Sequence, residues 1–174
     1  MTRLLTALIA VSMAFAAPLM AAEDVLPSST DEISIDRKAG AWVIFKNETR
    51  KSCFASYKSE NGYVVQFGFT KDETNGYLGL FSQDAKVEEG TRDITVIANG
   101  NVYFGESTGV AVNLSDGYEG GYILVNNPNF VKDIEKGKQL VAFPDSPNTY
   151  IIDMKGAKNA VYEVRKCTTE LHGS

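Results

Sequence analysis

The sequence predicts a mainly β protein, either an antiparallel β-sandwich or a barrel-like sheet, with two short helices near the C-terminus. Short apolar runs rich in β-branched and aromatic residues recur about every 8 to 15 residues, a spacing typical of such folds. Asn-Gly pairs at 61–62, 75–76 and 99–100 favour tight hairpin turns between these runs. Helical periodicity is found only after residue 126, so the helices belong to the last part of the chain.

A strand pattern fills the chain from Gly40 to residue 125 and returns twice after the first helix. Valine, isoleucine and aromatic residues dominate these runs, as expected for side chains that pack on a pleated surface. Before them, Ile33 and Ile35 alternate with polar residues and are compatible with a short edge strand. The expected strands are 41–45, 53–57, 63–69, 77–81, 93–97, 102–104, 109–114, 122–125, 140–143 and 149–154.

Two helices are expected late in the chain. The first begins with Asn127 as its N-cap and Pro128 in its first turn, and Gly137 ends it. The second starts at Gly156 and ends on Cys167, which makes it short and amphipathic. Its expected buried stripe is Ala157, Ala160, Val161 and Val164.

Residues 1–22 have the layout of a secretory signal peptide, with a positive charge at Arg3, an apolar run and then small residues. A membrane span needs roughly 20 apolar residues. The run here is shorter, and Pro18 interrupts it. We therefore expect cleavage after Ala21 or Ala22 and a mature form without a transmembrane helix.

The remaining chain is expected to form one domain. Segment 23–39 is polar and is predicted to be flexible, 40–168 to form a single β-rich domain, and 169–174 to be a tail. Export with this style of leader predicts a periplasmic location, with secretion beyond the cell as the alternative.

The only two cysteines are Cys53 and Cys167, so one intramolecular pairing exists. Oxidising compartments permit that disulfide, which would connect the last helix to the front of the fold. Closing so long a loop stabilises by about 4–5 kcal/mol in the chain-entropy model. The alternative interpretation is two separate buried thiols.

Composition argues against several functions. A formal net charge of −5 does not suit nucleic-acid binding, which depends on clustered Lys and Arg. The single histidine, His172, lies near the C-terminus, where a catalytic triad cannot be built on a fixed element. It is also the only soft metal ligand apart from the cysteines. We therefore expect no enzymatic activity, no metal site and no cofactor.

Acidic loops leave a second class of function open. Asp116 with Glu119, and Glu88 with Glu89, are carboxylate pairs of the kind that a glycoside hydrolase uses across a cleft. Solvated turns explain both pairs more simply. The alternative function is therefore a small periplasmic hydrolase, or an inhibitor of one, that acts through acidic loop residues.

A possible partner-binding surface lies in segment 116–130, which combines glycines, tyrosines and amides. Aromatic side chains with adaptable hydrogen bonding suit recognition of a protein or a glycan. The simpler interpretation is an ordinary strand between a turn and a helix cap. The candidate contact residues are Tyr118, Glu119, Tyr122, Asn126 and Asn127.

Four segments resemble the invasion-associated locus B family of small exported alphaproteobacterial proteins. They are GAW at 40–42, KSCFA at 51–55, FVKDIEKGKQLVAF at 130–143 and IIDMKGAKNAVYEVRKC at 151–167. The chain lacks a further cysteine that family members often carry, and 84–101 follows no family motif. The resemblance implies a non-catalytic envelope or periplasmic protein that binds a protein or cell-wall partner. It brings no catalytic residues, and a pathogenic role is not carried over.

Overall fold

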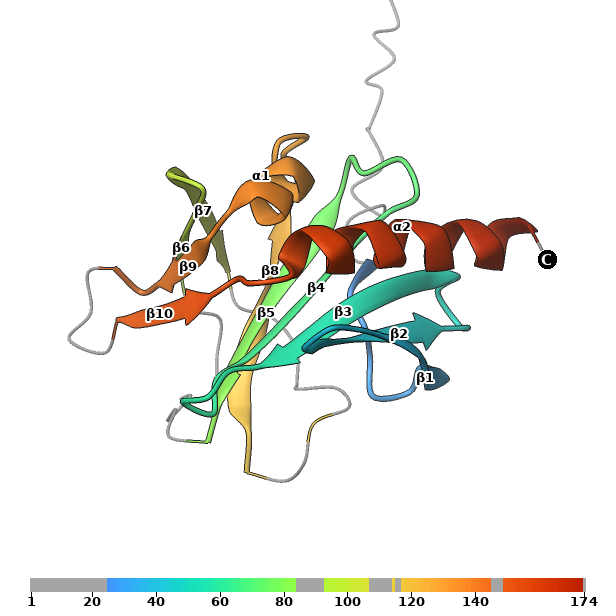
Figure 1. Ribbon diagram of the computed structural model, residues 1–174, viewed down its shortest axis with the longest axis horizontal. Coiled ribbons are helices and arrows are strands. Elements are labelled where there is room, and N and C mark those ends of the chain that lie inside the picture. The colour runs from blue at the N-terminus through green and yellow to red at the C-terminus, as the bar shows by residue number, and fades with distance from the viewer. Residues whose placement is uncertain (1–24, 84–92, 107–113, 115–116, 145–148, 174) are drawn as a thin grey trace, which may run out of the picture.

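The computed structural model describes residues 25–83, 93–106, 114, 117–144 and 149–173, which form two antiparallel sheets and two helices (Figure 1). The mainly β prediction is confirmed. The larger sheet contains β1 (Ile33–Ala39), β2 (Trp42–Asn47), β3 (Ser52–Lys58), β4 (Val64–Phe69), β5 (Gly76–Ser82) and β8 (Glu119–Val125), in that spatial order. The smaller sheet contains β10 (Tyr150–Asp153), β9 (Gln139–Ala142), β6 (Asp93–Ala98) and β7 (Asn101–Glu106), in that spatial order.

Asn-Gly pairs contribute to the turns in two different ways. Asn99 and Gly100 have φ values of 50° and 82° and join β6 directly to β7 in a two-residue hairpin. Both positions need the left-handed region, which Asn and Gly tolerate best. Gly76 instead begins β5, so the turn lies before it.

The longer helix, α2 (Ala157–Gly173), packs across one face of the six-stranded sheet (Figure 1). Its predicted stripe of alanines and valines is buried as expected. Opposite the start of α2, the Trp42 indole nitrogen donates a hydrogen bond of 3.1 Å to the Lys155 carbonyl oxygen. Gly156 makes the turn into α2 at φ 85°, a conformation that residues with side chains rarely adopt. Trp42 is thus fully buried and still hydrogen-bonded.

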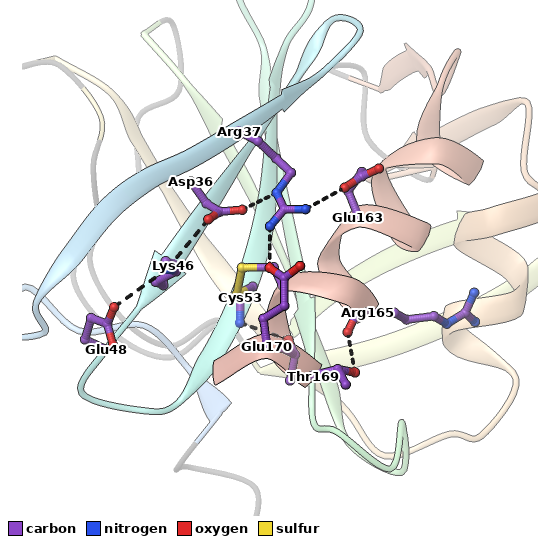
Figure 2. The surroundings of a disulfide bond; sticks show 11 residues. Asp36, Arg37, Lys46, Glu48, Cys53, Glu163, Arg165, Thr169 and Glu170 are labelled. Carbon is purple, nitrogen blue, oxygen red and sulfur yellow. Dashed lines mark hydrogen bonds and ion pairs between the residues drawn. A yellow bond between two sulfur atoms is a disulfide. The ribbon is translucent and has the colours of Figure 1, made fainter. Parts of the chain in front are cut away.

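The predicted disulfide between Cys53 and Cys167 is present, and it joins β3 to α2 (Figure 2). The two Cα atoms are 6.0 Å apart, and both residues are buried in the core between the helix and the sheet. The backbone nitrogen of Cys53 also donates a hydrogen bond of 3.2 Å to the Thr168 hydroxyl. The crosslink therefore holds α2 on the sheet at its middle.

A second connection holds α2 against the edge strand β1. Figure 2 shows the Arg37 guanidinium between Asp36 on β1 and two carboxylates of α2, Glu163 and Glu170. These hydrogen bonds raise the pKa of Arg37, with Asp36 the largest contributor, so its charge persists at every accessible pH.

We expect Arg37→Ala to lower the free energy of unfolding by about 1 kcal/mol, because solvent screens this partly exposed network. Urea denaturation of the oxidised protein measures the change. Arg37→Lys keeps the charge but not the forked geometry, and should recover only part of the loss. A variant as stable as the wild type would show that the Arg37 network contributes nothing to holding the helix.

Two predicted boundaries need correction. Residues 169–173 are not a tail, because α2 continues to Gly173 and buries Leu171 against the sheet. Segment 23–39 is not uniformly flexible: Val25 is buried, and β1 pairs along its length with β2. The Asp31 carboxylate fixes this segment by accepting hydrogen bonds from the Asn47 amide and the Arg50 guanidinium. The predicted leader, 1–22, lies outside the described residues.

The short helix α1 (Phe130–Lys136) also begins later than predicted, with Asn129 rather than Asn127 at the N-cap position. The Asn127 side chain instead accepts a hydrogen bond from the Asn129 backbone nitrogen. Gly137 ends the helix as expected. No helix in the described part of the chain is long and apolar enough to cross a membrane. The predicted strand 109–114 lies outside that part except for residue 114.

Candidate functional site

Tyr122, the central residue of the predicted contact surface, lies in the core. Its ring packs edge-on against Tyr77 and Phe81, and its hydroxyl donates a hydrogen bond to Gln66. Gly79 makes room for it, because a Cβ there would lie 2.5 Å from the Tyr122 ring. The residue is 0% exposed, so its prediction as a contact residue was wrong.

The other predicted contact residues do not form one patch. Tyr118 is buried, its hydroxyl has no hydrogen-bond partner among the described residues, and the Lys58 ammonium lies 5.3 Å from its ring centre. Glu119 is exposed at the start of β8, whereas Asn126 and Asn127 are exposed just after its end. A seven-residue strand is about 20 Å long. The structure therefore separates the acidic residue from the amides.

Of the four acidic candidates, only Glu119 is among the described residues; Glu88, Glu89 and Asp116 are not. The described residues contain no cluster of His, Cys, Asp and Glu that could hold a metal ion. His172, in the last turn of α2, lines a hollow of about 690 Å³ together with Ser52 and Asp72. No hydrogen bond joins these three described side chains, and the Asp72 carboxylate accepts bonds from Thr70 and Thr74 instead.

An exposed apolar surface lies on the outward face of the four-stranded sheet. Strand pairing places Ile151 opposite Val141, Val141 opposite Ile97, and Ile97 opposite Val102. These four side chains form a row across all four strands, and Phe104 stands two residues beyond Val102. We call these five residues the outer apolar face.

Exposure distinguishes the outer apolar face from the core. Phe104 is 74% exposed, Ile151 57% and Val102 47%. Along each strand these residues alternate with inward ones, such as Tyr103 and Ile152, that are buried in the core. An antiparallel sheet with one solvated face ordinarily carries polar residues there. The gathering of apolar side chains in one row on this face makes it a candidate protein-interaction site.

Asp133 of α1 fixes one end of this surface. Its buried carboxylate accepts hydrogen bonds from the Asn99 amide at 3.0 Å, the Asn101 amide at 2.7 Å and the Tyr103 hydroxyl. Burial alone would raise the pKa of Asp133, but these three donors, helped by Lys136, hold it below its usual value. The tip of the β6–β7 hairpin is thereby connected to α1.

A hollow of about 370 Å³ opens beside the row at this end. Ile97 and Val141 form its apolar side, whereas Lys136 ends α1 and Lys138 lies on the connection from α1 to β9. The Lys138 carbonyl oxygen accepts a hydrogen bond from the Met154 backbone nitrogen, which fixes this connection. The remaining lining residues are Asn99, Gly100 and Gln139. The hollow thus offers both apolar contact and positive charge.

Sequence patterns predicted the strands that carry this surface but not the surface itself. The runs at 93–97 and 102–104 have the composition of core strands, and only the pairing shows that one side faces outward. Searches of protein-family models, curated proteins and solved structures found no match to the chain.

Proposed function

We propose that this chain is an exported, non-catalytic protein of the bacterial envelope that acts by binding a partner protein through the outer apolar face. The observation that carries the proposal is the unbroken row of apolar side chains across the four-stranded sheet. Burying such side chains against a partner removes apolar area from water, which favours association by roughly 25 cal/mol for each Å² buried.

The location of the protein rests on separate support. A buried disulfide is consistent with an extracytoplasmic protein, because such bonds persist in oxidising compartments. The predicted leader at 1–22 favours the periplasm, and the resemblance to the invasion-associated locus B family suggests the same setting. A binding role also agrees with the non-catalytic character that the resemblance implies.

We expect the double substitution Phe104→Asp and Ile151→Asp to reduce capture of the partner from envelope extracts at least tenfold. The reason is that burial of large apolar side chains favours association, whereas a carboxylate in their place would have to be desolvated on binding. The experiment immobilises the oxidised protein and quantifies the captured proteins by mass spectrometry. Both positions are exposed, so the thermal midpoint should stay close to that of the wild type.

Tyr162→Asp is the matched control, because Tyr162 is 60% exposed but lies on α2. It should leave capture unchanged. Equal losses in both variants would point to nonspecific adhesion, and unchanged capture by the double variant would remove the outer apolar face from the proposal.

A further inference from the structure

Two lysines border the outer apolar face without an ion pair of their own. Lys136 and Lys138 are exposed and line the hollow beside Ile97 and Val141. Among the described residues, neither makes a salt bridge. These two lysines place positive charge beside an apolar surface on a chain whose net charge is −5.

Nearby carboxylates are already occupied. Glu135 pairs with Arg165, and Asp133 accepts its three hydrogen bonds from the β6–β7 hairpin. Asp153, at the same end of the smaller sheet, accepts a hydrogen bond from the Lys155 backbone nitrogen. Lys136 acts on Asp133 only through its field, and no carboxylate of the described residues lies within ion-pair distance of either ammonium group, so both can pair with an anionic group from outside the chain.

The dimensions of the surface favour a short segment over a second copy of the chain. Neighbouring strands lie about 4.8 Å apart, so a row across four strands is about 15 Å long. With one residue on each of three strands and two on β7, the outer apolar face covers on the order of 200 Å². A stable protein interface needs about 800 Å² from each partner.

We infer that the outer apolar face binds a short, acid-bearing segment of a partner protein, an inference that rests on the proposed function. Apolar side chains of the segment lie on the row from Ile151 to Val102, and a carboxylate reaches the hollow between Lys136 and Lys138. A bilayer with anionic lipids is the other anionic partner to consider. A bilayer presents many anionic head groups at once, so Asp153, which is exposed at the same end, would face them, whereas the single carboxylate of a segment can be placed at the two lysines alone.

The test selects binders from a random dodecapeptide library displayed on phage. The target is the chain expressed with its own leader and purified in the disulfide-bonded form. Enriched peptides are expected to combine apolar residues with Asp or Glu, and to bind less tightly as salt is added. Charge reversal with Lys136→Glu and Lys138→Glu should weaken their binding at least tenfold.

The control reverses two exposed lysines of α2, with Lys158→Glu and Lys166→Glu, and changes the net charge equally. It should leave peptide affinity within about twofold, since both lysines lie away from the hollow. Circular dichroism and the absence of free thiols confirm that each variant is folded.

Three results would overturn the inference, and they differ in what they say of the proposed function. In the first result, the binding of enriched peptides depends on Phe104 and Ile151, but the peptides contain no Asp or Glu. This result agrees with the proposed function and contradicts the acidic character of the partner. In the second result, peptide binding is unaffected by substitution of Phe104, Ile151, Lys136 or Lys138. This result contradicts both the inference and the proposed function. The third result is that no peptide is enriched but the chain co-sediments with vesicles of phosphatidylcholine and phosphatidylglycerol at 7:3. If that co-sedimentation depends on Phe104 and the two lysines, the partner is a membrane surface and not a protein.

Discussion

Replacing both cysteines with alanine is expected to lower the free energy of unfolding by about 4 kcal/mol, the largest effect of any change described for this chain. The disulfide joins residues 114 positions apart, so its loss frees a long loop in the unfolded state. Both sulfurs are buried, and alanine avoids placing new hydroxyl groups in the core. Guanidinium denaturation of Cys53→Ala/Cys167→Ala against the oxidised wild type measures the difference.

The reduced wild type is the control, because it removes the crosslink and keeps both side chains. It should unfold close to the double variant. If the double variant were within about 1 kcal/mol of the oxidised wild type, the packing of α2 and the Arg37 network would suffice to hold the helix.

Asp133→Ala is expected to lower the free energy of unfolding by about 3 kcal/mol. The substitution leaves three donors, from Asn99, Asn101 and Tyr103, without their acceptor, and the Tyr103 hydroxyl is buried. Asp153→Ala is the matched control, because its exposed carboxylate accepts a single local backbone bond. That variant should stay within about 0.5 kcal/mol of the wild type. Equal losses in the two would show that the Asp133 cluster contributes nothing specific.

The same carboxylate gives the stability a defined pH dependence. The folded-state pKa of Asp133 lies below its unfolded value of about 3.9, so its contribution is complete above that value. The contribution is lost as the pH falls through the folded pKa. The difference in unfolding free energy between wild type and Asp133→Ala should therefore be constant from pH 7 to about 5 and shrink towards pH 2.

Asp31 has a lowered pKa as well, because bonds from Asn47 and Arg50 outweigh the effect of its burial. Asp31 is present in the wild type and in Asp133→Ala, so its effect on the unfolding free energy cancels from the difference between them. A gap between wild type and Asp133→Ala that persisted unchanged to pH 2 would contradict the assignment.

Local patterns predicted the architecture because each element is encoded by neighbouring residues. Alternating apolar runs and Asn-Gly pairs marked most strands, and the spacing of Ala157, Ala160, Val161 and Val164 marked the buried stripe of α2. The end of α2 was missed because Leu171 was the only apolar signal beyond Cys167. Similarly, only tertiary contacts show that Val25 and Asp31 are fixed, since their surroundings in sequence are polar.

The outer apolar face could not be predicted from the sequence, for a different reason. Phe104 and Tyr122 both lie in strands of similar composition, yet one is exposed and the other is in the core. Which face of a strand meets solvent depends on how the two sheets pack, and no local pattern contains that information. Strand register was equally necessary, because Ile151 and Ile97 become members of one row only through Val141.

The position of Cys167 near the C-terminus has a consequence for biosynthesis. A ribosome delivers the chain from its N-terminus, so the sheet surface around Trp42 has no cover until the final helix has been made. Truncated products that end before α2 would present this bare surface to chaperones and proteases. Synthesis of α2 and closure of its crosslink to β3 are therefore both needed before the sheet around Trp42 is covered.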